Sequence, residues 1–215
     1  MNIEEIYERI KTNQPKLIYI SGKTSTGKST FTKRLTNDFD YKLIELDQIV
    51  LEAVIKPLKL PDEGSVFVEV YRNRDKKEWI ELFVQATRDL IKKYAQNSES
   101  LIIEGAVANP NTLQEIFDGY PKLSFIYFHP KTLDNYVRNL TNRFMVTNKL
   151  DRVGLPSAFW NLIDKSEFKQ FCENRILTGS LSNAIRKYAL LSQEESEKRL
   201  LLFKNYFENI EVVEV

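Results

Sequence analysis

The chain has 215 residues, with 31 basic and 30 acidic side chains and a formal net charge of +1. This length fits one domain, residues 1–215, with a sizeable apolar core. The balanced charge gives no sign of a nucleic-acid or membrane-surface partner. A single cysteine, Cys172, excludes an internal disulfide. The acidic start lacks the apolar core of a signal peptide, and no stretch reaches the roughly 20 apolar residues that span a bilayer, so we expect a cytoplasmic protein.

Short apolar runs alternate with helical patterns along the chain. Strands are predicted at residues 17–21, 43–46, 101–105, 123–128 and 210–215. Helices are predicted over residues 3–10, 28–36, 49–54, 75–94, 132–144, 159–176 and 181–207, the first opening on a capping box of Asn2 and Glu5. This alternation indicates an α/β fold in which helices cover both faces of a five-stranded parallel sheet. Ligands of such sheets bind beyond the carboxyl ends of the strands.

A complete phosphate-binding motif follows the first predicted strand. The pattern G-x-x-x-x-G-K-[ST] is met by Gly22-Lys23-Thr24-Ser25-Thr26-Gly27-Lys28-Ser29, and Thr30 continues into the next helix. The glycines let backbone amides turn toward phosphate oxygens, and the helix points its positive end at the anion. Lys28 is placed to reach the terminal phosphates and Ser29 to bind Mg²⁺. The motif predicts a three-layer α/β/α P-loop NTPase with strand order 2-3-1-4-5, which binds ATP with Mg²⁺.

Two acidic residues lie at the ends of predicted strands. A P-loop protein needs an acid near its metal ion, and a kinase needs a group that orients or deprotonates the acceptor hydroxyl. Asp47 follows the second strand, and Glu104, before Gly105, closes the third. Each has a simpler interpretation. Asp47 is suited to capping the helix that begins at Gln48, and Glu104 to facing solvent from a turn.

These motifs resemble those of the P-loop kinases related to uridine kinase and phosphoribulokinase. The resemblance rests on the phosphate loop, on Asp47 after the second strand, and on Ile102-Ile103-Glu104-Gly105 at the third. It implies that Asp47 is the catalytic base toward the acceptor hydroxyl and that Glu104 lies near the metal and the acceptor. It further implies that the core covers about 15–128 and 176–215, that 56–75 forms the acceptor pocket, and that 138–158 forms a mobile lid.

In that group, lid arginines neutralise charge during phosphoryl transfer. Arg138 and Arg143 are the leading candidates and Arg152 the third, although helix arginines are also commonly just solvated. Within the insertion, Tyr71, Arg72 and Arg74 are suited either to substrate contact or to a charged surface turn. The single histidine, His129, precedes Pro130 and favours a strand-capping role over catalysis.

The resemblance predicts an ATP- and Mg²⁺-dependent kinase for a small hydroxyl-bearing metabolite, with a nucleoside or riboside as the leading acceptor; a nucleotide sugar stays open. Two other classes of nucleotide-binding protein also remain open. A GTPase is suggested by Asn148-Lys149-Leu150-Asp151, which matches a guanine-reading motif, but the third strand ends in Glu104-Gly105 instead of Asp-x-x-Gly. A regulatory ATP-binding module or a partner-coupled ATPase would bind ATP without acceptor-dependent turnover.

Overall fold

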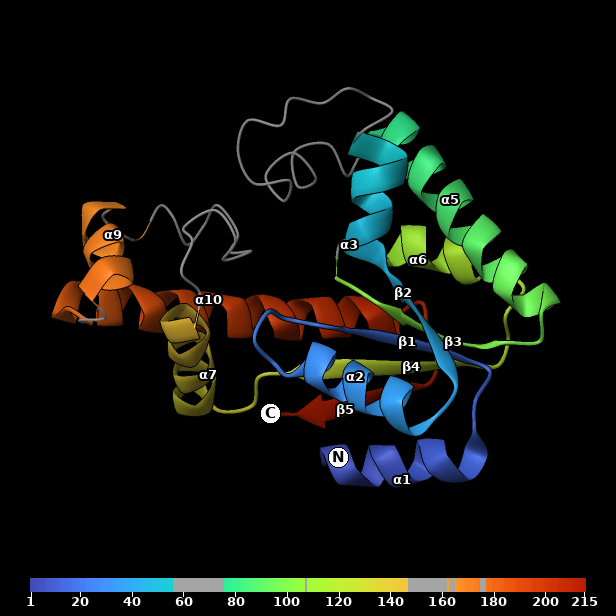
Figure 1. Cartoon of the computed structure of the whole chain (residues 1–215), viewed down its shortest axis with the longest axis horizontal. Coiled ribbons are helices and arrows are strands. Elements are labelled where there is room, and N and C mark those ends of the chain that lie inside the picture. The colour runs from blue at the N-terminus through green and yellow to red at the C-terminus, as the bar shows by residue number, and fades with distance from the viewer. Residues whose placement is uncertain (56–75, 107, 147–161, 163–164, 175–176) are drawn as a thin grey trace.

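A five-stranded parallel sheet forms the centre of the computed structural model (Figure 1), which describes residues 1–55, 76–106, 108–146, 162, 165–174 and 177–215. Its strands are β1 (Leu17–Gly22), β2 (Tyr41–Glu45), β3 (Ser100–Glu104), β4 (Leu123–His129) and β5 (Ile210–Glu214). They lie in the order β2-β3-β1-β4-β5, and every neighbouring pair is parallel. The predicted fold class and strand order are confirmed.

Helices lie on both faces of this sheet. They are α1 (Ile3–Asn13), α2 (Lys28–Asp38), α3 (Leu46–Ile49), the π-helical turn η1 (Val50–Ile55), α5 (Lys77–Gln96), α6 (Pro110–Phe117), α7 (Leu133–Val146), α9 (Lys165–Asn174) and α10 (Gly179–Lys204). Figure 1 shows α1 and α2 on one side of the sheet and α3, α5 and α6 on the other, with α10 running along the strands. The molecule therefore has three layers, as the sequence predicts.

Alternation along β1 explains how one strand serves both layers. Leu17 and Tyr19 belong to a buried cluster with α3, α5, α6 and the end of α10, whereas Ile18 and Ile20 belong to a second cluster with α1 and α2. Successive side chains of a strand point to opposite faces, so an uninterrupted apolar run is what a strand covered on both sides requires. This burial fixes β1 at the centre of the sheet, with the phosphate loop at its carboxyl end.

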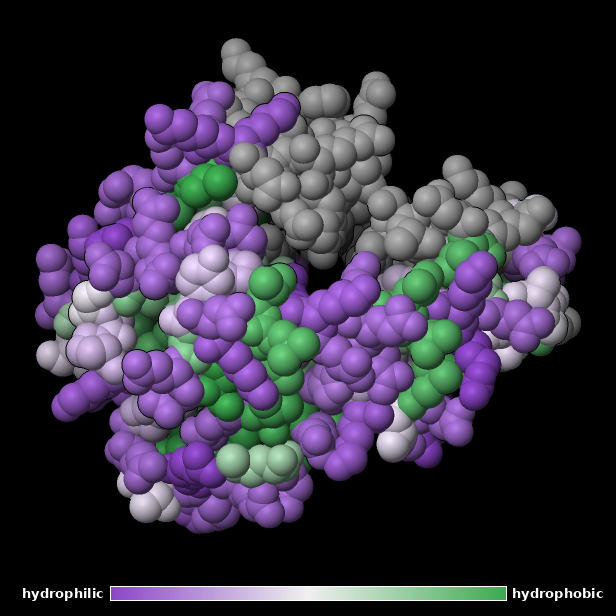
Figure 2. Space-filling model, turned by 180° about the vertical axis from the view of Figure 1, so that it is seen from behind, coloured by the Kyte–Doolittle hydropathy of each residue, from purple (hydrophilic) through white to green (hydrophobic). Residues whose placement is uncertain are grey.

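The face seen from behind in Figure 2 is mainly hydrophilic, with apolar areas among the hydrophilic side chains. Exposed leucines on α10 are Leu190, Leu191, Leu201 and Leu202. In the described part of the chain, no helix combines the length and the apolar character that crossing a membrane requires.

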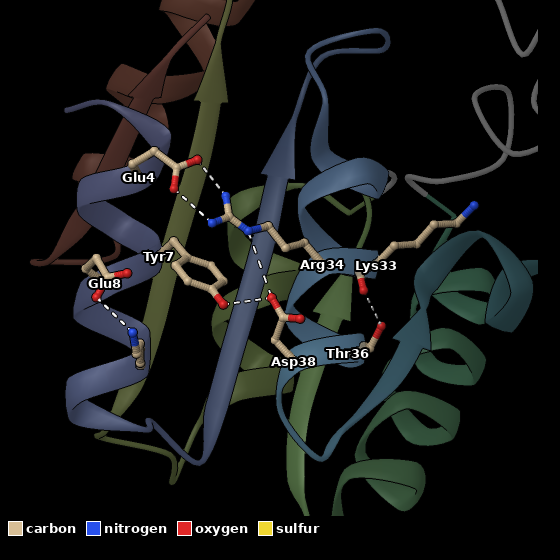
Figure 3. Close-up of polar contacts among 8 residues, drawn as sticks. Glu4, Tyr7, Glu8, Lys33, Arg34, Thr36 and Asp38 are labelled. Carbon is tan, nitrogen blue, oxygen red and sulfur yellow. Dashed lines mark hydrogen bonds and ion pairs between the residues drawn. The ribbon is translucent and has the colours of Figure 1, made fainter.

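A polar network fastens α1 to α2 (Figure 3). Arg34 donates two hydrogen bonds to the Glu4 carboxylate, and its guanidinium lies 3.7 Å from the centre of the Tyr7 ring. The Tyr7 hydroxyl in turn donates to Asp38 at 2.7 Å. The predicted capping box is present, since the Asn2 side chain and Glu5 bond each other's backbone amides. These contacts hold α1 against the helix that carries the phosphate loop.

The structure corrects three expectations about local structure. The second strand ends at Glu45, and Asp47 lies in the first turn of α3; the helix cap is Glu45, so Asp47 as the cap was wrong. The buried Leu46 starts the helix earlier than the apolar run suggested. Helix α6, between β3 and β4, was not predicted; it begins at Pro110 behind an Asn109 cap, a recognisable start signal.

Gly22 joins β1 to the phosphate loop in a conformation that only glycine tolerates. Its φ is +137°, and a Cβ there would lie 2.3 Å from the Phe128 carbonyl oxygen on β4. We expect Gly22→Ala to lower the free energy of unfolding by about 3 kcal/mol or more, because strained φ and a backbone clash add up. Urea unfolding measures this loss.

Gly119→Ala is the matched control for Gly22→Ala. Gly119 also has a positive φ, +86°, but in the described part of the chain no atom beyond its own sequence neighbours lies within 4 Å of the added Cβ. Backbone strain alone should cost about 1–2 kcal/mol. Equal losses in the two variants would contradict the proposed clash with β4.

Candidate active site

A cavity of about 1290 Å³ opens at the carboxyl ends of the strands. It is bounded by the phosphate loop, by Asp47 and Leu51 beyond β2, by Glu104 at the end of β3 together with the chain that follows it, and by residues of α7 and α10. Small-molecule pockets usually span about 300–1,000 Å³, so this cavity has room for a nucleotide and a second small molecule.

The phosphate loop has the backbone that its motif requires. Gly22, Ser25 and Gly27 all have positive φ, the last at +90° directly before α2. The Thr26 hydroxyl donates to the Lys23 carbonyl at 2.6 Å and closes the turn. The Ser25 hydroxyl is buried and has no hydrogen-bond partner among the residues that the structure describes. A curved loop with an unsatisfied buried hydroxyl at a helix N-terminus fits an anionic oxygen ligand.

Lys28 turns into this loop. Its Nζ donates to the Lys23 carbonyl oxygen at 2.6 Å. Burial lowers the pKa of Lys28 to about 8, while the carboxylates of Glu104 and Asp47 oppose the shift. The ammonium is therefore mostly charged near neutral pH, as a phosphate-binding lysine must be.

Ser29, in the first turn of α2, contacts Glu104 at the carboxyl end of β3. The Ser29 hydroxyl donates to Glu104 Oε1 at 2.8 Å. Glu104 is only 9% exposed, so its interpretation as a solvent-facing turn residue was wrong. Mg²⁺ uses few protein oxygens and completes its shell with water and phosphate oxygens. The hydroxyl and carboxylate beside the phosphate loop suit that ion.

Asp47 reaches the same cavity from the first turn of α3, just beyond β2. Solvent reaches its side chain from the cavity. Burial of the carboxylate against the cavity wall nevertheless raises the pKa of Asp47, an effect that the charge of Lys28 opposes and that of Glu104 reinforces. A raised pKa makes this carboxylate a better proton acceptor than a freely solvated aspartate.

Helix α10 forms a cavity wall that sequence reasoning missed. Glu195 makes an ion pair with Lys23 of the phosphate loop, and Lys198 and Arg199 also line the cavity. No motif marks these residues, since they lie in a long helix rich in charged side chains. Only the packing of α10 along the sheet brings them to the loop.

The predicted lid arginines separate in the structure. Arg143, on α7, lines the cavity, and its charge contributes to lowering the pKa of Lys28. Arg138 lies outside the cavity lining and donates to the Asn135 side chain at 3.1 Å. The last residue of β4, His129, contacts the Ser196 hydroxyl at 3.0 Å, and burial lowers the pKa of His129. It does not line the cavity.

Several predicted features lie outside the described residues. They are the insertion 56–75 with Tyr71, Arg72 and Arg74, most of the predicted lid beyond Val146 with Arg152, and the guanine-type motif at 148–151. The lid and the acceptor insertion stay predictions.

Comparisons with known proteins find similar solved structures at low identity. No protein-family model and no curated protein matches the chain. An uncharacterized protein from Eubacterium ventriosum is 14% identical with a TM-score of 0.45, over 94% of this chain and 89% of that one. A shikimate kinase from Bacteroides thetaiotaomicron is 14% identical with a TM-score of 0.47, over 86% and 81%. A gluconokinase from Sinorhizobium meliloti is 14% identical with a TM-score of 0.38, over 87% and 97%.

Proposed function

We propose that this protein is an ATP- and Mg²⁺-dependent kinase that transfers the γ-phosphoryl group to a hydroxyl of a small metabolite. A nucleoside or riboside is the leading acceptor. The observation that carries the proposal is that one cavity gathers the phosphate loop, the Ser29–Glu104 pair and the Asp47 carboxylate. An anion cradle, an oxygen site for Mg²⁺ and a basic carboxylate are the parts that phosphoryl transfer needs.

Each group has a distinct role in the proposed reaction. The loop amides and Lys28 hold the phosphates, and Ser29 with Glu104 places Mg²⁺, which neutralises phosphate charge when bound. Asp47 accepts the proton of the acceptor hydroxyl while the oxygen of that hydroxyl bonds to the γ-phosphorus. The bond from that phosphorus to the bridging oxygen breaks, and ADP leaves. Most of the rate comes from positioning and electrostatics.

Arg143 is the better placed of the two lid candidates for neutralising charge on the transferred group, because it lines the cavity and Arg138 does not. The sequence resemblance to the uridine kinase and phosphoribulokinase group supports the same division of labour. In that group, the acid that follows the second strand acts on the acceptor hydroxyl, and Asp47 holds the corresponding position in this chain.

A screen for acceptor-dependent ADP release tests this function. Nucleosides, ribosides, vitamins and sugars are offered with ATP or GTP and Mg²⁺, and the reaction without acceptor is the control. We expect at least one acceptor to raise ADP release well above that background, with ATP preferred. Nucleotide binding with no acceptor effect across the panel would favour the regulatory module, and a preference for GTP with unassisted hydrolysis would favour the GTPase.

A further inference from the structure

One short stretch of α10 bonds the chain beyond two neighbouring strands of the sheet. Beyond β1, Glu195 makes its ion pair with Lys23 of the phosphate loop. Beyond β3, the Nη2 of Arg199 donates two hydrogen bonds of 2.6 Å, to the carbonyl oxygens of Ala106 and Ala108. Glu195 and Arg199 are four residues apart, so they lie about 6 Å from each other along the same side of the helix. One turn of α10 therefore connects the two chains.

The same stretch of α10 is anchored to β4. The Nδ1 of His129, the last residue of β4, lies 3.0 Å from the Ser196 hydroxyl oxygen, and the Tyr127 hydroxyl donates to the Ser196 carbonyl oxygen at 3.3 Å. The Gln193 side chain donates to the Pro130 carbonyl oxygen at 3.0 Å. Because β3, β1 and β4 lie side by side in the sheet, this turn of α10 holds the chains beyond β3 and β1 against a third, neighbouring strand.

The two chains that α10 connects carry the two halves of the proposed Mg²⁺ site. Ser29 follows the phosphate loop beyond β1, and Glu104 is the last residue of β3, directly before the chain that Arg199 bonds. Within the sheet, Ile20 pairs with Glu104, and the Gly105 amide donates to the Ile20 carbonyl oxygen at 3.1 Å. Mg²⁺ demands oxygen ligands at about 2.0–2.1 Å in near-octahedral geometry, so it depends on the relative position of the two chains.

We propose that Glu195 and Arg199 are positioning residues that brace the phosphate loop against the chain beyond β3. The brace holds Ser29 and Glu104 at the separation that Mg²⁺ binding requires. This inference rests on the proposed kinase function and adds how its metal site is held. Arg199 is the stronger half of the brace, because its guanidinium carbon also lies 5.2 Å from the centre of the Phe203 ring. Glu195 is the weaker half, since its side chain is 65% exposed and solvent screens its ion pair.

The magnesium response of nucleotide binding tests the brace. This response is the ratio of two dissociation constants of a non-hydrolysable ATP analogue on the full chain, measured in EDTA and in excess Mg²⁺. Arg199→Met removes the hydrogen-bond donors but keeps a side chain that can pack on Phe203, and it should lower the ratio about tenfold. Loss of the charge alone predicts the opposite, because removing a cation whose charge acts on Lys28 of the phosphate loop favours Mg²⁺ binding.

Further variants separate a shared brace from independent local effects. Glu195→Gln should lower the magnesium response about two- to threefold, as expected for an exposed ion pair. The double variant should lose no more than Arg199→Met alone, because a brace released at one end no longer acts at the other. Lys204→Met and Glu194→Gln remove exposed charges of either sign from the same helix, and as matched controls they should leave the response unchanged.

Hydrogen exchange of the Gly105 amide gives a readout that needs no nucleotide. This amide bonds the Ile20 carbonyl oxygen where the chains leave the sheet. Arg199→Met should speed its exchange in the nucleotide-free protein, while amides in the middle of β3 exchange as before and Lys204→Met has no effect. Faster exchange throughout β3 would indicate general destabilisation and contradict a local brace.

Three results would overturn the inference: a magnesium response that Arg199→Met leaves unchanged or raises, losses that simply add in the double variant, or unchanged exchange at Gly105. Failure of the proposed function looks different, since the unmodified protein would then bind no nucleotide analogue with or without Mg²⁺. In that case the Gly105 amide still decides whether Arg199 braces the two chains.

Discussion

Lys28→Ala is expected to lower kcat/KM for ATP by at least about 10²–10³-fold. The ammonium is the positive charge inside the phosphate loop, where its Nζ bonds the Lys23 carbonyl, and it lies near the carboxylates of Glu104 and Asp47. Without it, phosphate oxygens would enter a site whose nearest charges are negative. Steady-state kinetics with ATP as the varied substrate measures the loss.

Lys33→Ala is the matched control on the same helix. Lys33 is exposed on α2, and its side chain points away from the labelled polar contacts in Figure 3. It should leave ATP use unchanged. Lys28→Arg keeps the charge in an altered shape and should fall between the two. Full activity of Lys28→Ala would remove the phosphate loop from the proposed mechanism.

Asp47→Asn is expected to keep nucleotide affinity and to lower kcat by about 10²–10⁴-fold. The amide has nearly the same shape as the carboxylate but does not accept the acceptor proton. Because burial raises the pKa of Asp47, its charge is disfavoured in the folded protein, and the substitution should not lower the thermal midpoint. Acceptor-dependent ADP release, nucleotide titration and thermal unfolding of one preparation give the three readouts.

Asp40→Asn serves as the control, since the Asp40 side chain is 98% exposed in the turn before β2. It should match the unmodified protein in all three measurements. Undiminished transfer by Asp47→Asn would rule out Asp47 as the base. Loss of nucleotide binding in that variant would instead place Asp47 on the nucleotide side of the cavity.

The phosphate loop was predictable because every feature of it is local. A buried strand, the glycines, Lys28 and the following helix are consecutive, and the structure shows each of them. The sheet order followed from the same class of fold. The meeting of Ser29 with Glu104 was also predictable, since Ser29 follows the loop at the carboxyl end of β1 and Glu104 ends the neighbouring strand β3.

The rest of the site depends on packing that no local pattern records. Arg199 reaches the cavity because α10 lies along the sheet and its Nη2 bonds the chain beyond β3. Nothing in its neighbours distinguishes it from a solvated helix arginine. The helical start at Leu46 was misjudged for a related reason, since the burial of that side chain depends on Gly105, where an added Cβ would lie 2.7 Å from the Leu46 Cβ.

Equilibrium binding of ATP to the purified full chain in excess Mg²⁺ tests the central claim most directly. A loop that cradles a polyphosphate predicts one nucleotide per chain, bound with a dissociation constant of about 1 μM to 1 mM. Calorimetry against the Lys28→Ala variant, in which this binding should be lost or much weaker, assigns it to the loop. No binding of any nucleoside triphosphate by the unmodified, folded protein would contradict the account.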